Sequence, residues 1–389
     1  MDHMSILNKF FSVGEICMQN KPIKKYFLTT FAILTLVMAS VSLSACSGQQ
    51  SVDTTEKVPD NNATDKAEDT ELKDVMSEYL SITETFEDMS GMIQSNVKCL
   101  NIDSANVNDV QISTVEYSSQ YPLTIYDRKQ NVVYYSERVY VSDDDYGDQL
   151  FVYDLSTKES RQLTDNLYAV NYIFPEKDYV YMLGAVKNTH YLTIMRYDLK
   201  TNNLIVFDET GEWSFDLFVY DVYNGRFYAS ACNTEEEYNC RERYNSRPEE
   251  EYDDKFTPAS YTVFEFGDDF YNPKEIFHTE SKYVRRIAPT PDGKLFITIA
   301  DTIPVMDPNY ESYYLDISTG ELSDAPAIDD ATYVTEYVYF FPNDDKIYFI
   351  GVDPETDKMV LCSYNQQNNG IEVVYKPSNA HINNCFMLK

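Results

Sequence analysis

Histidine, tryptophan and glycine are scarce in this chain, and basic residues are outnumbered. Its 389 residues include 4 histidines, 1 tryptophan and 12 glycines, and 64 acidic residues against 31 basic ones give a net charge of −33. A surface this acidic repels nucleic acid and anionic lipid headgroups, which excludes nucleic-acid binding as a main role.

The motifs of common enzyme classes are also missing. No Gly-x-Ser-x-Gly elbow, phosphate-binding loop or Cys-x-x-Cys occurs. After the N-terminal region the only histidines are His190, His278 and His381, and no two have metal-ligand spacing. These absences argue against a serine hydrolase or a zinc enzyme. We therefore predict no catalytic constellation, no bound metal and no cofactor.

The N-terminal region has the features of an export signal. Lys24 and Lys25 precede the apolar run Phe27–Leu43, and small residues lead to Cys46. A basic start, a short apolar segment and small residues at a cut site are typical of a secretory signal peptide. The start of the protein is either Met1 or Met18.

The residues Leu-Ser-Ala-Cys at positions 43–46 resemble the bacterial lipobox. That resemblance implies a diacylglyceryl group on Cys46 and cleavage just before it. Residues 1–45 are then a lipoprotein signal peptide, and the rest of the chain lies on the extracytoplasmic face of the cell membrane, held there by the lipid. A plain signal peptide and a single membrane anchor are the alternatives.

Two segments separate Cys46 from the main domain. Residues 46–70 are mostly Ser, Thr, Asp, Glu, Asn and Lys, a composition that cannot bury a core, so we predict a disordered tether. In residues 71–95 the apolar positions are spaced mostly by three and four. This spacing predicts an amphipathic helix, either docked on the main domain or part of the linker.

Strand-forming residues dominate from residue 96 to residue 389. Runs of Tyr, Phe, Val and Ile alternate with tight-turn pairs such as Asn224-Gly225 and Asp292-Gly293. Aromatic and β-branched residues favour strands because they pack well on a pleated surface. The chain has 34 tyrosines, which we assign mainly to this packing. Short strands with frequent turns predict a sandwich, a barrel or a propeller.

A turn followed by a strand with an aromatic residue at the fourth position recurs five times. The copies are Asn131–Tyr134, Asp178–Tyr181, Gly225–Tyr228, Gly293–Phe296 and Asp345–Tyr348. Their aromatic residues are 47, 47, 68 and 52 residues apart. With its flanking strands, each copy makes a four-stranded unit of the length expected for a β-propeller blade.

A second pattern follows the first in each unit. Its clearest copies are Val152–Thr157, Arg196–Thr201 and Leu315–Gly320. This strand and turn resemble the propeller repeats of TolB-like proteins and of DUF5050-type extracytoplasmic propellers. The resemblance covers residues 96–389 and implies a fold much more than a function.

The two ends of the domain supply one further blade. His381–Leu388 has the pattern of an innermost strand, and Val97–Ile102 and Val110–Tyr117 precede the first unit. We predict that these strands combine and close the ring. The predicted fold is an all-β propeller of six four-stranded blades, and a seven-bladed ring is the alternative.

The third unit carries an insertion, Asn233–Ala259, which accounts for the spacing of 68 residues. It is rich in Glu, Asp, Arg and Tyr. Insertions in repeat proteins often gather on the binding face, so the segment is a candidate recognition loop. A solvated surface loop is the alternative.

Carboxylates occur in two clusters and at one position that recurs in the repeats. Asp143, Asp144, Asp145 and Asp148 form one group, and Glu249, Glu250, Glu251, Asp253 and Asp254 form another. Oxygen ligands suit calcium, but neither group has the alternating ligands and glycine of a calcium loop, so we predict solvated tips. The repeated Asp154, Asp198 and Asp316 each have Thr three residues later, which predicts a turn device and not a catalytic set.

Five cysteines lie in the predicted domain. Cys232 with Cys240, and Cys99 with Cys385, are candidate disulfides in an exported protein, and Cys362 would then be left over. Cysteine connectivity cannot be read from sequence, and buried free thiols are the alternative.

The leading functional hypothesis is a non-enzymatic binding or scaffold module whose ligand is a protein, a peptide or a cell-wall glycan. It rests on a repeat architecture without catalytic motifs. The alternative is a glycan-active or peptide-active enzyme that uses carboxylates at the propeller channel, since distant loops can assemble a site. A purely structural member of an envelope complex is the third reading.

Overall fold

The recurring turn and strand of the sequence form a hairpin in each of five sheets. Asn131, Gly225 and Gly293 have positive φ angles of 54°, 67° and 82°, the left-handed conformation that Gly and Asn adopt most readily. The strand after each repeated turn is the second of its sheet: β5 (Val132–Ser142), β9 (Tyr179–Val186), β13 (Arg226–Asn233), β17 (Lys294–Ala300) and β21 (Lys346–Val352).

The computed structural model divides the chain into two units, Met1–Val75 and Met76–Lys389. It describes residues 79–103, 106–142, 145–189, 191–246, 256–267, 270–302, 309–330, 332–342, 344–353, 355–356 and 358–388. The predicted signal peptide, the lipidation site Cys46 and the predicted tether lie outside the described residues.

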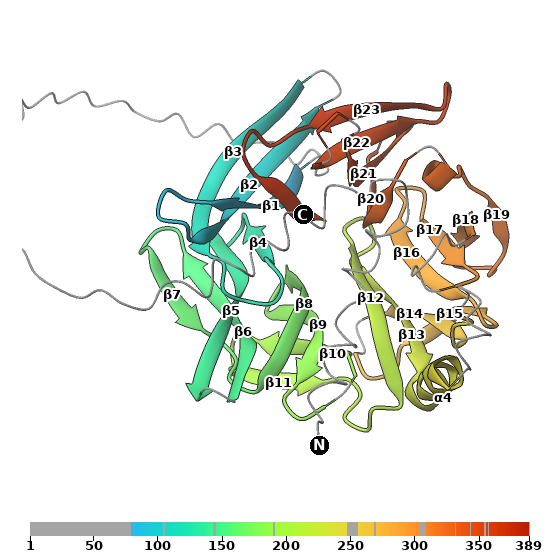
Figure 1. The fold of residues 1–389 in the computed structure, drawn as a ribbon, viewed down its shortest axis with the longest axis horizontal. Helices are drawn as coiled ribbons and strands as arrows, with labels where there is room; N and C mark the ends of the chain where they lie inside the picture. Colours follow the sequence, from blue (N-terminus) through green and yellow to red (C-terminus); the bar gives the residue numbers. More distant parts are fainter. Residues whose placement is uncertain are drawn as a thin grey trace, which may run out of the picture. The chain divides into compact units, whose positions relative to one another are not determined.

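Six antiparallel four-stranded sheets form the blades of a β-propeller, as predicted (Figure 1). Blade 2 contains β4 (Thr124–Asp127), β5, β6 (Asp145–Asp154) and β7 (Glu159–Gln162), and blade 3 contains β8 (Leu167–Glu176), β9, β10 (Thr193–Asp198) and β11 (Asn203–Val206). Blade 4 contains β12 (Trp213–Asp221), β13, β14 (Tyr261–Phe266) and β15 (Lys274–Thr279).

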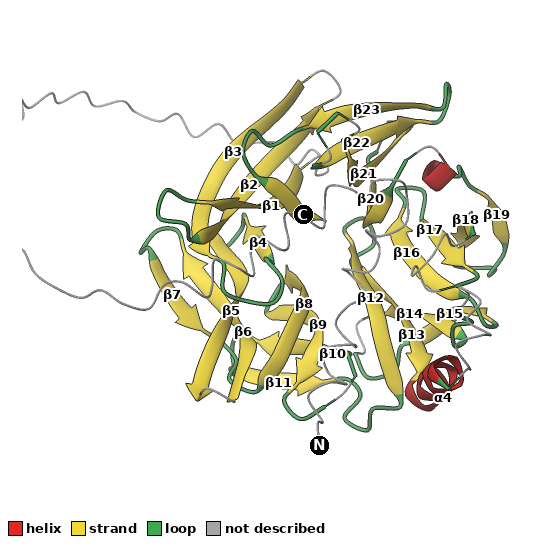
Figure 2. Ribbon diagram, in the orientation of Figure 1, coloured by secondary structure: helices red, strands yellow, loops and turns green. Residues whose placement is uncertain are grey.

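Blade 5 contains β16 (Tyr283–Pro289), β17, β18 (Tyr310–Asp316) and β19 (Leu322–Asp324). Blade 6 contains β20 (Val334–Phe340), β21, β22 (Met359–Asn365) and β23 (Gly370–Tyr375). Two helical segments interrupt the strands, α4 (Thr234–Asn245) and the short 3-10 helix η2 (Ile328–Asp330), both drawn in red in Figure 2.

Blade 1 joins the two ends of the domain. Its strand order is β24 (His381–Met387), β1 (Tyr79–Glu87), β2 (Ile93–Asp103) and β3 (Asn106–Glu116). The C-terminal strand is innermost and pairs with β1 from Leu80 to Thr85. The predicted closure of the ring by both termini is therefore confirmed, and the ring has six blades.

The helix predicted over residues 71–95 is wrong for its described part. Tyr79–Glu87 is a strand, and Ile93 begins the next one. The spacing of three and four ran across two strands and the turn between them. Leu80, Ile82 and Thr83 are all fully buried, because β1 is covered on both faces and hydrogen-bonded on both edges. The pairing of this segment with distant strands decides its structure, and the spacing of apolar residues in the sequence does not reveal that pairing.

Aromatic side chains fill the space between blades. The rings of Phe174 in blade 3 and Tyr220 in blade 4 stack with centroids 4.2 Å apart. Within blade 4, Phe218 and Phe227 lie parallel at 4.8 Å. Such pairs add to the free energy gained from burying their apolar area. The abundance of Phe and Tyr in the sequence thus has a structural explanation at the blade interfaces.

The ring has two different faces. Neighbouring strands in a blade run antiparallel, so connections from first to second and from third to fourth strands share one face. We call this the turn face, and it includes residues 128–131 and 155–158. The second-to-third connections share the opposite, loop face, which includes residues 88–92 and α4. The Leu388 amide donates to the Tyr79 carbonyl at 2.9 Å, which places both ends of the domain on the turn face.

Candidate binding site at helix α4

Helix α4 occupies the start of the insertion predicted at Asn233–Ala259. Asn233 caps the helix, since its side-chain oxygen accepts from the amides of Glu235 and Glu236 at 3.1 Å each. Three glutamates occupy the first turn and Arg243 the last, an order that complements the helix dipole. The cap and charge order were readable from the sequence but were not used to predict the helix.

The inner side of α4 is fixed to blade 4 and its neighbours. Glu236 Oε1 accepts from both the amide and the hydroxyl of Ser260 at 2.9 Å. The Thr234 amide donates to the Glu212 carbonyl at 3.0 Å. Cys240 is buried, and the Tyr244 ring packs edge-on against Phe256 at 5.1 Å. Residues Thr234–Asn245 of the insertion are therefore an ordered helix and not a solvated loop.

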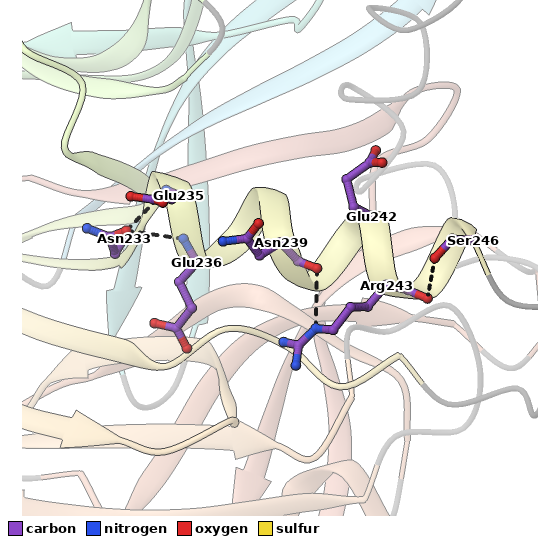
Figure 3. Close-up of a pocket in the computed structure, with 7 residues that line it drawn as sticks. All are labelled: Asn233, Glu235, Glu236, Asn239, Glu242, Arg243 and Ser246. Carbon is purple, nitrogen blue, oxygen red and sulfur yellow. Dashed lines mark hydrogen bonds between the residues drawn. The ribbon is translucent and has the colours of Figure 1, made fainter.

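Helix α4 borders a hollow of about 720 Å³. The lining residues recur at helical spacing, as Figure 3 shows, and are Asn233, Glu235, Glu236, Asn239, Glu242, Arg243 and Ser246. Four of the lining side chains are charged, namely Glu235, Glu236, Glu242 and Arg243, and Arg243 Nε donates to the Asn239 carbonyl at 3.3 Å. Polar groups on one helix side can bind a peptide or a glycan by hydrogen bonds and repel anions.

A group of ionisable side chains lies beneath α4. Asp216 occupies a bulge in β12, between the paired residues Phe215 and Leu217. Bulges re-aim a side chain, and here the Tyr261 hydroxyl donates to Asp216 Oδ2. Burial and the charge of Glu237 raise the pKa of Asp216 to about 6. Sequence reasoning missed Asp216, because a bulge has no sequence signature at a single aspartate.

Helix α4 contributes two charged residues to this group. Arg241 Nε and Nη2 both donate to Glu237 Oε1, at 2.9 and 2.6 Å. The Cys232 thiol lies 3.8 Å from Glu237 Oε2, and burial, with the two carboxylates, raises its pKa. We call Asp216, Cys232, Glu237, Arg241 and Tyr261 the α4 cluster. It combines a carboxyl that titrates near neutral pH with an ion pair.

Asp145 and Asp148 of the first acidic cluster form ion pairs with different partners. Asp148 is fully buried, accepts from the Gln120 amide at 2.7 Å and pairs with Arg138 at 3.0 Å. Asp145 pairs with Lys187 at 2.6 Å. Asp148 is thus a structural anchor and not part of a solvated tip. Asp143 and Asp144 lie outside the described residues, as does the second group, Glu249–Asp254.

The repeated aspartates form turns, as predicted. Asp154 Oδ1 accepts from the amides of Ser156 and Thr157 at 2.7 and 2.9 Å. The equivalent bonds recur at Asp198 and at Asp316. These bonds lower the pKa of all three carboxyl groups. The aspartates fix the tight turns between third and fourth strands.

The five cysteines of the domain are buried free thiols, and neither predicted disulfide is formed in the structure. Cys99 and Cys385 do share blade 1, but β1 separates their strands. Cys99 pairs with Ser81 and Cys385 with Ile82. Consecutive residues of β1 point to opposite faces of the sheet, so the two thiols do as well. The two cysteines are two strands apart and their side chains point to opposite faces of the sheet, so they cannot form a disulfide.

The histidines are not brought together. His278 on β15 shares a hydrogen bond with Thr262 at 3.1 Å, and His381 begins β24 in another blade. His190 lies outside the described residues. Across the described part of the chain, no three His, Cys, Asp or Glu residues are placed to hold a metal ion. Nor does any helix there have the length and hydropathy to cross a membrane.

Comparisons with known proteins identify a fold. No protein-family model and no curated protein sequence matches the chain. TolB from Acinetobacter baumannii has a similar structure, with a TM-score of 0.51 and 12% identity. The match covers 79% of this chain and 66% of TolB, so this chain spans slightly less than two thirds of the length of TolB. A chain of a nidogen/laminin complex matches with a TM-score of 0.48 and 10% identity, over 79% of this chain and 97% of that one.

The β-propeller domain of the Trilobed protease from Pyrococcus furiosus matches with a TM-score of 0.45 and 12% identity, over 78% of this chain and 83% of that one. The likeness to TolB supports the TolB-like propeller fold that the sequence repeats indicated. Identities this low speak to the fold alone.

Proposed function

We propose that this protein is an exported lipoprotein whose propeller is a binding or scaffold module for a protein, a peptide or a cell-wall glycan. A lipid on Cys46 would hold it at the extracytoplasmic face of the cell membrane. The resemblance of the repeats to DUF5050-type extracytoplasmic propellers agrees with this location. The basic residues, apolar run and lipobox-like end of residues 24–46 support the anchor.

The observation that carries the binding proposal is the position of α4. The tight turns of the opposite face are built from short, self-bonded segments, whereas α4 adds a capped helix and a polar hollow to the loop face. Both ends of the domain lie on the turn face. The hollow therefore lies on the face opposite Tyr79, where the described part of the chain begins.

Photo-crosslinking in intact cells tests the binding site. A photoreactive residue replaces Asn239, which lines the hollow, and the matched control replaces Lys200, whose side chain is 70% exposed in a turn of the opposite face. We expect a defined adduct from position 239 alone. Equal adducts from both positions, or none from position 239, would contradict a site at α4.

Mass analysis of that adduct separates the ligand classes, because a protein or peptide gives peptide fragments and a glycan gives sugar fragments. Co-purification from membranes addresses the third reading, a purely structural role in an envelope complex. If the role is purely structural, the partner should still co-purify with the Glu242→Arg variant, which changes the lining of the hollow.

The enzyme alternative has one specific observation in its favour. Asp216 and Glu237 bring two carboxylates together, and one has a pKa near neutral pH. Glu237 comes from α4 and not from an innermost strand, so these are not the channel carboxylates that the alternative invoked. Turnover of a glycan or peptide that is lost in both Asp216→Asn and Glu237→Gln would establish the enzyme and refute the binding-only role.

A further inference from the structure

The outermost strand of blade 1 is unusually long. Among the described strands, β3 is hydrogen-bonded to β2 alone, and Figure 1 shows it on the outside of the ring. It has 11 residues, whereas the outermost strands of the other five blades have from 3 to 6. Within the described part of the chain, the longest free sheet edge therefore belongs to blade 1.

The sequence of β3 does little to prevent a further strand from pairing with it. Edge strands are usually protected by short length, lysine, proline or bulges. β3 contains no lysine, arginine or proline. Its register with β2 shifts once, which leaves Ile112 as a bulge between two paired stretches. The stretch Ser113–Glu116 is regular, and it can accept another strand.

The pairing of β3 with β2 fixes which backbone groups point outward. The Tyr117 amide donates to the Ile93 carbonyl at 3.3 Å, in the register that pairs Thr114 with Asn96. In an antiparallel pair every second residue is hydrogen-bonded to the partner strand, and the residues between direct their N–H and C=O groups to the other side. Thr114 and Glu116 therefore present these groups at the free edge, and both residues are exposed.

Two carboxylates lie beside this stretch. Glu116 ends β3, and Glu137 belongs to β5 in the neighbouring blade. Burial raises the pKa of Glu137, and the charge of Glu116 adds to this effect, which shows that the two groups are close. In the described part of the chain neither carboxylate forms an ion pair with a basic side chain. A positive charge placed beside them would offset their mutual repulsion.

We propose that the stretch Ser113–Glu116 binds an extended, basic peptide, which adds one strand to blade 1 and places a lysine or arginine beside Glu116 and Glu137. The peptide backbone exchanges hydrogen bonds with the outward groups of Thr114 and Glu116. This mode of recognition takes its affinity from main-chain bonds and its specificity from side chains on alternate positions.

Charge favours a basic peptide over a second copy of this chain as the occupant. The chain has a net charge of −33, and β3 carries Asp109 and Glu116 but no basic residue. Two β3 edges would repel each other, whereas a basic segment is attracted by the strand and by the surface around it. The site is in blade 1 and does not depend on the ligand proposed for the hollow at α4 in blade 4.

Calorimetric titration of the full-length protein with a short peptide that alternates lysine and valine tests the proposal. Thr114→Pro removes the outward N–H, and proline is tolerated at such positions of edge strands. Thr114→Val is the matched control, because it loses the same hydroxyl contacts with Asn96 and Gln111 but keeps the N–H. We expect the wild type and the control to bind alike, and Thr114→Pro to bind roughly tenfold more weakly.

Two modified peptides and one double variant complete the test. A peptide with glutamate in place of lysine should not bind. The lysine peptide methylated on its backbone nitrogens should not bind either, which tests the main-chain bonds even if Thr114→Pro fails to fold. Glu116→Gln combined with Glu137→Gln should weaken binding of the lysine peptide and reduce its salt dependence.

Three results would overturn the proposal. They are absence of binding to the wild type, equal binding to Thr114→Pro or of the methylated peptide, and a wild-type dimer that Thr114→Pro dissociates, since a second copy would then occupy the edge. A normal crosslink at position 239 without peptide binding would reject the β3 site alone. Peptide binding without that crosslink would reject the site at α4 alone.

Discussion

Arg286 of blade 5 forms a two-pronged ion pair with Asp329, which lies just before blade 6. Nη1 and Nη2 each lie 2.6 Å from one carboxylate oxygen, and the two side chains are 0% and 8% exposed. The same guanidinium donates to the carbonyls of Val334 and Thr335 at 2.6 Å. One side chain thus joins two neighbouring blades through charge and backbone together.

Arg286→Met should strongly destabilise the domain. It leaves Asp329 buried without a cation, and removal of one partner of a buried pair typically costs about 3–5 kcal/mol. Chemical denaturation measures the free energy of unfolding. Lys200→Met is the matched control, because its pair with Asp178 is exposed to solvent and should contribute little to the free energy of unfolding. Equal losses in both variants would disprove this role of Arg286.

Closure of the ring depends on the hydroxyl of Thr83. It donates to Asn384 Oδ1 at 2.6 Å and lies 2.7 Å from Thr124 Oγ1, which links β1 to β24 and to blade 2. Thr83→Val keeps the shape but leaves buried polar atoms without partners, which should cost about 1–3 kcal/mol. Thr114→Val, on the exposed surface of β3, should change the unfolding midpoint little. The idea fails if the two variants unfold alike.

Asp353 should add acid sensitivity to blade 6. Its carboxylate pairs with Lys376 at 2.5 Å and accepts from the Glu355 amide at 3.0 Å. The bonds from Lys376 and Thr356 lower its pKa to about 2. A lowered pKa stabilises the fold above the ordinary value near 4, and this contribution is lost as the pH falls toward 2. Thermal unfolding of Asp353→Asn and Lys376→Met should be less pH-dependent than the wild type across that window.

The thiols should behave as buried and unpaired groups. Alkylation followed by peptide mass analysis should label Cys99, Cys232, Cys240, Cys362 and Cys385 slowly in the native protein and rapidly after unfolding. Oxidation of the native protein should never join Cys99 to Cys385. Recovery of that linkage would show that the register of blade 1 differs from the one described.

The sequence allowed five of the six blades to be recognised because each of these five repeats the same local chemistry. A turn residue with positive φ, such as Asn131 or Gly225, leads into a strand with a buried aromatic residue. Asp154 and its equivalents mark the next turn by their own hydrogen bonds. These signals are local, so they survive in the sequence without knowledge of the tertiary structure.

What could not be predicted depends on partners distant in sequence. Tyr79–Glu87 forms a strand because β24, at the other end of the domain, pairs with it. The raised pKa of Asp216 arises from a bulge in β12 and from Glu237 on a helix that follows the next strand. Asp148 likewise looks like one of several surface acids until Arg138 and Gln120 enclose it.

The placement of β1 inside its sheet has a mechanical consequence. The chain enters the domain at Tyr79, in a strand that is hydrogen-bonded to β24 on one edge and to β2 on the other. Tension applied at Tyr79 in the direction of β1 loads both ladders in shear, so many bonds must break together. Force in that direction at the first strand does not peel the propeller open strand by strand.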